Sequence, residues 1–463
     1  MSIEDIFSVE SVCLIGASRE EGKVGNTILK NLKRSFKGEI ILVHPVADEI
    51  EGIRCYKTVE SIPSPVDLGV VSLPSEKTLE AVESLAIKGC KFCIPVAGGF
   101  GELGEKGKNM ETRMKEISLK YGMRIIGPNT VGVIIPRTGL NTSLTTDEKS
   151  RFPTDGPIGF VSQSGALGLL TMDEFTDLGV GFSSFFSLGN EIDIDQTDVI
   201  STLGKDDKTR SIALYIEKIT RIEEFLQECR KTAMKKGIVA IKGGQTESGS
   251  RATSLHTGSL LRTSFSLKGI FRQNGIIQAR DEVELIDFAS ALASGKPVKG
   301  KRVAVVSSAG GVGVIATDAL EVQGFNVNRV SDMLARRIKP EISAIGSPFN
   351  PIDMTAEATD SQYENVINEL DRSGEFDSII AFVLFQTFGV TEDIIGFLKE
   401  FNRSGATPLV VGVVGGEYTR EVLRKLNGNG IPAFPSIPRS IAALSTLKER
   451  GDFLRRFEHD SGP

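Results

Sequence analysis

The chain has 463 residues, which is too long for a single hydrophobic core, so two to four domains are expected. Hydrophobic residues make up 40% and charged residues 25%, and the net charge is −6. Because Lys and Arg are intermixed with Asp and Glu throughout, this pattern excludes the concentrated basic face of a nucleic-acid-binding protein.

The sequence also argues against export and membrane insertion. No apolar run approaches the ~18 residues of a membrane helix, and the N-terminus, MSIEDIFSVESV, lacks a basic and then apolar signal pattern. Five cysteines, an odd number scattered along the chain, indicate reduced thiols. We therefore expect a cytoplasmic protein.

Short apolar runs alternate with helical patterns along the chain, which is typical of parallel α/β domains. Three units are predicted, over residues 1–135, 156–295 and 301–455, joined by polar or Gly/Pro-containing stretches. In the first unit, strands are expected at 11–16, 39–45, 67–74, 92–98 and 123–133, and helices at 24–35 and 76–89. The sequence predicts an α/β fold of three parallel-sheet domains.

The second and third units contain an internal repeat. The stretch FVSQSGALGLLTMDEFTDL, from Phe160, matches VVSSAGGVGVIATDALEVQ, from Val305, at a constant offset of 145. Each copy reads as a strand, a Ser/Gly-rich turn and a helix, which exposes backbone N–H groups and a positive dipole end to an anion. Two such turns predict two helix ends that share one phosphate. The expected phosphate-binding residues are Ser162, Ser164, Gly165, Gly310 and Gly311.

The turn after the first strand, GASREEGKVGN, predicts contact with a pyrophosphate, but it does not match an NAD fingerprint. The G-x-G-x-x-G spacing of that fingerprint fails, because position 18 is Ser. The second strand ends in His44 and Pro45, where an NAD site needs an acidic residue for the ribose. A different ligand with adenosine and pyrophosphate, such as coenzyme A, fits the turn without that carboxylate. The expected contacts are Gly16, Ala17, Ser18, Lys23, Gly25, Pro45, Leu73 and Pro74.

Nine short motifs together carry a resemblance to a known family. In chain order they are GASREEGKVGN, GGFGE, GPNTVGV, VSQSGALG, SLGNEIDID, YIEKI, SLHTGSL, SSAGGVGV and NPIDM. The chain resembles the α subunits of the nucleoside-diphosphate-forming acyl-CoA synthetases, above all the ADP-forming acetyl-CoA synthetases of archaeal type. Succinyl-CoA synthetase is similar but more distant, since its α subunit stops after two domains.

The resemblance implies a Rossmann-like CoA-binding domain followed by two flavodoxin-like domains. It implies that acyl-CoA (acetyl-CoA in the main reading), phosphate and ADP give free acid, CoA and ATP, which is substrate-level phosphorylation. It further implies that His256 is phosphorylated, that Glu217 supports it, and that helix ends at Gly165 and at Gly310–Gly311 hold the phosphate.

The chemistry of the residues agrees with these roles. Imidazole has an ordinary pKa of about 6.5, so His256 is largely neutral and nucleophilic near neutral pH. Glu217 ends a strand, where it can orient the imidazole and stabilise the developing charge. Asn129, in GPNT, is a candidate donor to the thioester oxygen. The thirteen residues 243–255 span at most roughly 40 Å, so His256 is also a candidate phosphoryl carrier.

No ADP site is evident in the sequence, so a partner chain is expected to supply one. The resemblance implies an ATP-grasp β subunit that binds ADP or ATP with Mg²⁺, in an α₂β₂ assembly. No metal site is predicted in this chain, because the acidic run EIDIDQTD at 191–198 fits no calcium-loop spacing. His44 is either close to the CoA adenosine or structural, and His459 is expected in a solvated tail.

Three other functions compete with this interpretation. A non-catalytic acyl-CoA-sensing module would keep the first domain but would not need His256, Glu217 or paired helix ends. A protein lysine acyltransferase of related architecture would need a further acetyltransferase domain, for which no residues remain. A dehydrogenase is disfavoured by the missing ribose carboxylate.

Overall fold

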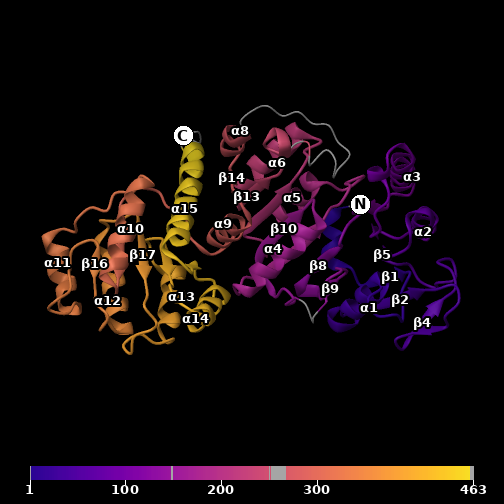
Figure 1. Cartoon of the computed structure of the whole chain (residues 1–463). Coiled ribbons are helices and arrows are strands. Elements are labelled where there is room, and N and C mark those ends of the chain that lie inside the picture. The colour runs from indigo at the N-terminus through magenta and orange to yellow at the C-terminus, as the bar shows by residue number, and fades with distance from the viewer. Residues whose placement is uncertain (1, 147–149, 250, 252–266, 459–463) are drawn as a thin grey trace. The chain divides into compact units, whose positions relative to one another are not determined.

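The computed structural model describes residues 2–146, 150–249, 251 and 267–458 (Figure 1). Contacts divide the chain into two compact units. The first comprises residues 1–176, 181–235 and 240–270, and the second comprises residues 177–180, 236–239 and 271–463. Hydrogen bonding among the described strands forms three sheets, of seven, seven and five strands.

The first sheet has the strand order β3-β4-β2-β1-β5-β6-β7. Apart from the antiparallel pair of β3 and β4 it is parallel. With β3 set aside, this is the 3-2-1-4-5-6 order of the Rossmann fold. Its elements are β1 (Ser11–Ile15), β2 (Glu39–Val43), β3 (Glu49–Ile50), β4 (Ile53–Tyr56), β5 (Leu68–Val71), β6 (Phe92–Pro95), β7 (Arg124–Ile125), α1 (Val24–Ser35), α2 (Ser75–Ile87) and α3 (Glu105–Tyr121), with short 3₁₀ helices at Ile3–Ser8 and Gly101–Leu103.

Hydrophobic periodicity explains how these elements pack. The four residues of β5 are all buried, as expected for a central parallel strand covered on both faces. Val82 and Leu85 of α2 and Met114 of α3 join Cys13 of β1 in one core cluster, so both helices cover the same face of the sheet. Helix α1 spans the predicted 24–35 and buries Ile28, among other residues.

The second sheet has the order β14-β13-β12-β10-β11-β8-β9. Strand β10 pairs in parallel with β11 and β12, and β10 to β14 follow the 2-1-3-4-5 order of flavodoxin-like folds. Strand β8 pairs antiparallel with β11, so residues 133–135 belong to this sheet by hydrogen bonding. Its elements are β8 (Val133–Ile135), β9 (Leu140–Asn141), β10 (Asp155–Ser162), β11 (Phe182–Ser187), β12 (Ser211–Ile216), β13 (Gly237–Lys242), β14 (Ile276–Gln278), α4 (Gly165–Asp177), α5 (Gln196–Lys205), α6 (Ile222–Ala233), α8 (Leu267–Gln273) and α9 (Glu282–Ser294), with a 3₁₀ turn at Pro136–Thr138.

The third sheet is parallel, with the order β16-β15-β17-β18-β19, which is again 2-1-3-4-5. Helices α4 and α10 follow the first strand of their sheets, and both their starts and their ends are 145 residues apart, as in the sequence repeat. The elements are β15 (Val303–Ser307), β16 (Ile352–Asp353), β17 (Ser378–Phe382), β18 (Leu409–Gly412), β19 (Ala433–Phe434), α10 (Gly310–Val322), α11 (Asp332–Ile338), α12 (Asp360–Ser373), α13 (Ile394–Ser404), α14 (Glu417–Gly428) and α15 (Ile437–Glu458), with a 3₁₀ turn at Lys339–Glu341. The predicted fold class of one Rossmann-like and two flavodoxin-like sheets is confirmed.

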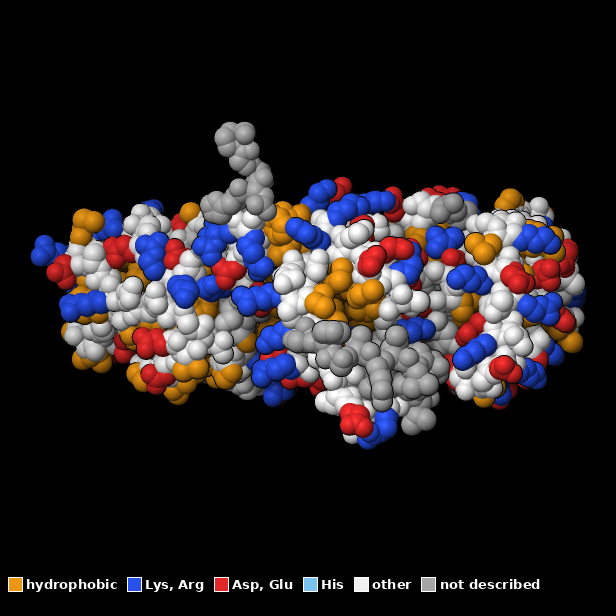
Figure 2. All heavy atoms as spheres, turned by 90° about the horizontal axis from the view of Figure 1, so that it is seen from above, with side chains coloured by type: hydrophobic (Ala, Val, Ile, Leu, Met, Phe, Trp, Pro, Cys, Tyr) orange, Lys and Arg blue, Asp and Glu red, His pale blue; other side chains and the backbone are white. Residues whose placement is uncertain are grey.

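Surface and composition agree with the sequence analysis. On the face shown in Figure 2, basic and acidic side chains are interspersed rather than gathered by sign. Among the described helices, none is both long and apolar enough to cross a bilayer. All five cysteines are buried and free, and burial raises the pKa of Cys13, in β1, to about 12.

Candidate active site

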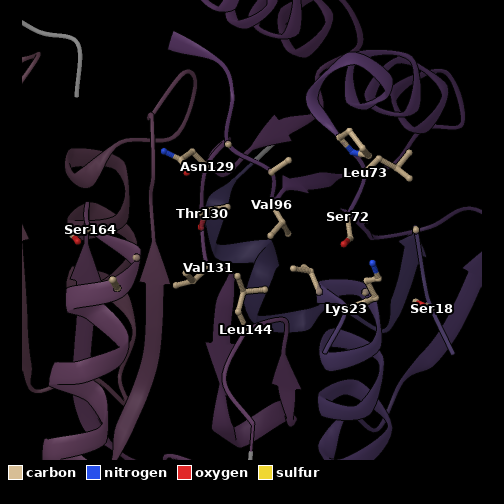
Figure 3. A pocket seen from close by; sticks show the side chains of 18 of the residues that line it. Ser18, Lys23, Ser72, Leu73, Val96, Asn129, Thr130, Val131, Leu144 and Ser164 are labelled. Carbon is tan, nitrogen blue, oxygen red and sulfur yellow. The ribbon is translucent and has the colours of Figure 1, made fainter. Parts of the chain in front are cut away.

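A cavity of about 700 Å³ opens at the carboxyl ends of three strands of the first sheet and one strand of the second. Its walls come from the turns after β1, β5, β6 and β10, with further residues from 129–131 and Leu144 (Figure 3). Strands β1 and β5 are neighbours from which the chain winds in opposite directions, and this switch point is where open α/β sheets bind ligands. The lining residues are Gly16, Ser18, Lys23, Val24, Gly25, Ser72, Leu73, Pro74, Val96, Ala97, Gly98, Asn129, Thr130, Val131, Leu144, Gln163, Ser164, Gly165 and Ala166.

Two glycines let the first turn and α1 pack closely below the cavity. Gly16 has a φ of +90°, and a Cβ atom there would lie 2.3 Å from the carbonyl oxygen of Ser72. A Cβ atom on Gly25 would lie 2.0 Å from the carbonyl oxygen of Gly16. Neither contact is possible for a larger residue, so the two glycines allow the helix start and the backbone of the turn to lie at the cavity wall.

Three helix N-termini border the cavity. Helix α1 begins after Lys23, α2 begins after Pro74, and α4 begins after Ser164. Neither Lys23 nor Pro74 makes a side-chain cap within the described residues. Figure 3 shows Lys23 and Ser18 on one side and Ser164 on the other, with Val96, Val131 and Leu144 between them. Helix dipoles and the Lys23 ammonium group favour an anionic ligand, and the apolar residues suit its non-polar parts.

The cavity brings together six of the eight residues predicted to contact CoA: Gly16, Ser18, Lys23, Gly25, Leu73 and Pro74. Ala17 is buried beside the turn, and Pro45 is exposed; neither is among the described lining residues. His44 has a structural contact, because its Nδ1 atom accepts hydrogen bonds from the N–H groups of Val46 (3.2 Å) and Ala47 (2.9 Å).

Asn129 lines the cavity, but its amide nitrogen already has partners. Its Nδ2 atom donates to Glu102 Oε1 (2.7 Å) and Asn190 Oδ1 (3.3 Å). The backbone of Asn129 has a φ of +58°, which Asn tolerates better than most residues. To donate to a thioester oxygen, the amide would have to break one of these two hydrogen bonds and form a new one to the substrate.

Of the predicted phosphate-binding residues, Ser164 and Gly165 line the same cavity at the start of α4. Ser162 ends β10 and supports this turn, since its hydroxyl donates to the carbonyl oxygen of Ser164 at 2.7 Å. Gly310 and Gly311 begin α10, in the other compact unit, and are exposed. A Cβ atom on Gly310 would lie 2.8 Å from Asp353 Oδ2.

Glu217 follows the last residue of β12 and is half-buried. The hydroxyl group of Tyr215 donates to Glu217 Oε1 at 3.2 Å. The Nζ atom of Lys242, which ends β13, donates to the backbone carbonyl of Glu217 at 2.8 Å and to that of Gly243 at 2.5 Å. Burial lowers the pKa of Lys242, and the nearby charge of Glu217 opposes that shift. The stretch that carries His256 thus leaves the sheet beside Glu217, while His256 itself lies outside the described residues.

Sequence reasoning missed Gln163, which is buried and lines the cavity. Its side-chain oxygen accepts from the N–H groups of Glu217 and Lys218, the latter at 2.9 Å, so it joins the turn before α4 to the end of β12. The signal was present in VSQSG, where a long amide stands between the two small serines of the turn.

Three carboxylates of the acidic run at 191–198, those of Asp193, Asp195 and Asp198, are engaged in ion pairs or in the cap of α5. Asp193 Oδ2 lies 2.9 Å from Arg124 Nε, and Asp195 caps α5 and pairs with Arg221. No cluster of metal-ligating side chains is found among the described residues.

Comparisons with known proteins agree with this geometry. A model of a CoA binding domain matches residues 10–136, and a model of a succinyl-CoA ligase like flavodoxin domain matches residues 155–292. The chain is 36% identical to the acetate–CoA ligase [ADP-forming] I subunit alpha of Pyrococcus furiosus, over 96% of this chain and 97% of that protein. The chain belongs to the family of ADP-forming acetate–CoA ligases.

Two further family members extend the comparison. The acetate–CoA ligase [ADP-forming] I of Archaeoglobus fulgidus is 34% identical over 96% of this chain, which spans 63% of that longer protein. The solved structure of dinucleotide forming acetyl-coenzyme A synthetase 1 from Ca. Korarchaeum cryptofilum, in complex with phosphate and ADP, has a TM-score of 0.90 and 31% identity, covering 100% of this chain and 99% of that one. As a member of this family the chain is an acid–thiol ligase, and its first domain is of the CoA-binding type.

Proposed function

We propose that this chain is the catalytic α subunit that converts acetyl-CoA or another acyl-CoA, phosphate and ADP into free acid, CoA and ATP. The observation that carries the proposal is the cavity where Lys23 and the N-termini of α1, α2 and α4 meet. In a family of CoA ligases, that arrangement suits the phosphates of CoA near α1 and inorganic phosphate near α4.

The first step joins phosphate to the acyl group. A phosphate oxygen attacks the thioester carbon, the C–S bond breaks, and CoA leaves as its thiolate with an acyl phosphate as the other product. Ser164 and Gly165 hold the phosphate through backbone N–H groups in a pre-organised position. Asn129 donates to the developing oxyanion after releasing Glu102.

In the second step a ring nitrogen of His256 attacks the phosphorus atom, and the acid leaves as its carboxylate. Glu217 accepts a hydrogen bond from the other ring nitrogen and stabilises the positive charge on the ring. Tyr215 and Lys242 support this position, because they contact the carboxylate and the backbone of Glu217. The role of Gly310 and Gly311, at the start of α10, as phosphate-binding residues stays a prediction from the sequence.

The third step gives the phosphoryl group to ADP on a partner chain. The Pyrococcus relative is named as an alpha subunit, and the Archaeoglobus relative continues well beyond the matched region within one chain. We infer that an ATP-grasp β subunit holding ADP with Mg²⁺ supplies this part, in an α₂β₂ assembly. The buried free thiols favour a cytoplasmic setting.

The proposal is tested by thiol release from acetyl-CoA with the full chain and a candidate ATP-grasp partner. We expect that release of the CoA thiol requires both phosphate and ADP. One molecule of ATP should form for each thiol released. Glu217→Gln should keep CoA binding and lower ATP formation by about 10²-fold or more. Thiol release that is independent of phosphate, or CoA binding without any turnover in the complex, would contradict the proposal.

A further inference from the structure

Gln163 joins the cavity to the end of β12, and Glu191 contacts its side chain. Gln163 Nε2 lies 2.7 Å from Glu191 Oε2, 2.8 Å from the carbonyl oxygen of Lys218 and 2.9 Å from Gln196 Oε1. The orientation of the amide is set by the backbone N–H groups of Glu217 and Lys218, which donate to its oxygen. With two hydrogens for three acceptors, Gln163 has no spare donor.

Glu191 has two features that a solvated carboxylate lacks. Its φ is +56°, which is uncommon for a residue other than glycine and needs support from its surroundings. Its Oε1 atom is buried and has no hydrogen-bond partner within the described residues. An unpartnered oxygen of a buried ionised carboxylate costs more free energy than the same oxygen in a neutral carboxyl group, because the buried charge loses its hydration.

We propose that Glu191 is a positioning residue that, as an uncharged acid, holds Gln163 between the start of α4 and Glu217. The catalytic consequence of this inference rests on the proposed function. The charge state of Glu191 can be measured whether or not the proposed function is correct. Glu191 acts through Gln163, and its role is to keep that side chain in place without adding a negative charge near the phosphate site.

The surroundings of Glu191 favour the neutral form. Burial is the largest effect on the pKa of Glu191 and raises it, and the charge of Asp195 adds to this. The charge of Lys218, the hydrogen bond from Gln163 and a backbone hydrogen bond from Gln196 lower the pKa, and the balance leaves it raised to about 8. Lys218 Nζ also donates to the carbonyl oxygen of Asn190 at 3.0 Å, and Asp195 is paired with Arg221, so both charges have other partners.

A functional consequence follows from the position of Gln163 beside Ser164. A negative charge on Glu191, close to the proposed phosphate site, would repel phosphate and the acyl phosphate. Because Glu191 is protonated at neutral pH, the site avoids this repulsion. The carboxyl group still accepts a hydrogen bond from the side-chain amide of Gln163. As the pH rises through about 8, ionisation of Glu191 should weaken phosphate binding.

The charge state is tested by urea unfolding of the full chain. Since the pKa of Glu191 in the folded chain lies above its ordinary value of 4.5, the folded state keeps a proton that the unfolded state releases between pH 4.5 and about 8. The unfolding free energy of wild type should therefore fall relative to that of Glu191→Gln as the pH rises from 4.5 to about 8. Above that range the difference between the two should stay constant. Glu223→Gln, on the exposed face of α6, is the matched control and should show no such trend.

The positioning role is tested with the complex and inorganic phosphate. The KM of wild type for phosphate should rise by about tenfold between pH 7 and pH 9, which is the change expected if only the protonated form binds. Glu191→Gln should keep kcat near pH 7 within about threefold and show a flatter KM profile, whereas Glu191→Ala should lose about tenfold or more in kcat/KM. Equal losses for Gln and Ala, or identical pH profiles for wild type and Glu191→Gln, would overturn the proposal.

The two readouts separate two possible failures. If the unfolding difference appears as expected but the wild-type complex shows no phosphate-dependent turnover, the proposed function fails while the charge assignment stands. If turnover is normal and the unfolding difference does not depend on pH, Glu191 is ionised in the folded chain and the inference is wrong.

Discussion

The Nζ atom of Lys242 lies 2.8 Å from the backbone carbonyl oxygen of Glu217. Lys242 ends β13, and Glu217 follows the last residue of β12. The hydrogen bond therefore joins the backbone of Glu217 to the start of the stretch that carries His256. The same ammonium group also binds the carbonyl oxygen of Gly243. In the proposed reaction, this contact sets where His256 can meet Glu217.

Replacing Lys242 with Met should therefore impair phosphoryl transfer more than CoA binding. Two backbone carbonyls lose a charged donor, which should destabilise the chain by about 1–3 kcal/mol. Phosphorylation of His256 should slow by about tenfold or more, while the Kd for CoA stays within about twofold. Rapid-quench labelling and calorimetry measure the two effects. Equal losses in both would show that Lys242 supports only the general fold.

Gly25→Ala tests the close approach of α1 to the first turn. The new methyl group would lie 2.0 Å from the carbonyl oxygen of Gly16, so the helix must move away from the turn. We expect a loss of about 1–3 kcal/mol in unfolding free energy and weaker CoA binding. Gly396→Ala, in α13, is the matched control, because a Cβ atom there meets no other atom within 4 Å. That variant should be neutral or more stable by up to about 1 kcal/mol. Unchanged CoA affinity in Gly25→Ala would contradict the assigned role of the turn.

Lys23→Ala should weaken CoA binding and reduce its dependence on salt. Lys23 borders the cavity at the N-terminus of α1, where its charge adds to the helix dipole. A loss of one contact to phosphate should raise the Kd by about threefold to thirtyfold at low ionic strength, with a smaller difference in high salt. Lys77→Ala, an exposed lysine on α2, is the control. Titration of CoA at two salt concentrations gives the answer, and a salt-independent effect would point to packing instead.

The pair of Asp195 and Arg221 should make stability depend on pH at the acidic end. Burial opposes ionisation of Asp195, but two hydrogen bonds from Arg221, at 2.8 and 2.7 Å, outweigh it and hold the pKa of Asp195 below its ordinary value of 3.8. Since the pKa is lowered in the folded state, the pair stabilises the chain above pH 3.8 and ceases to do so as the pH falls through the folded value.

Arg221→Met should accordingly cost roughly 1–3 kcal/mol near pH 7, toward the low end because Arg221 is partly exposed. The difference from wild type should shrink below about pH 4. Urea unfolding at several pH values measures it. Arg403→Met, which removes an exposed pair with Glu400, should change stability by less than about 0.5 kcal/mol and serves as control.

Much of the fold could be predicted because hydrophobic patterns and small residues coincide at the parallel strands. The strand from Ser11, the helix over 24–35 and the repeat from Phe160 are local signals, and the structure has each of them. The short strands β3, β4 and β9 were not anticipated, because segments of two to four residues carry too little periodicity. Pairing of β8 with the second sheet depends on contacts with β11 that are distant in sequence.

The candidate site was only partly accessible to sequence reasoning. Turn glycines and helix starts such as Gly16 and Gly165 have recognisable local patterns, and both line the cavity. The network of Gln163, Glu191 and Lys242 could not be derived, because it depends on which strand ends lie next to each other and on how deeply a carboxyl group is buried. Polar residues of this kind look like ordinary surface residues in a linear sequence.

The most direct test of the proposed reaction is to label the full chain with acetyl-CoA and radioactive phosphate, beside His256→Ala and a His459→Ala control. An acid-labile, alkali-stable label on wild type and on His459→Ala, but none on His256→Ala, is the predicted result. The label should leave as ATP when ADP and the partner chain are added. If wild type binds CoA tightly yet takes no label, even with the partner present, the chain is an acyl-CoA sensor and His256 is not a phosphoryl carrier.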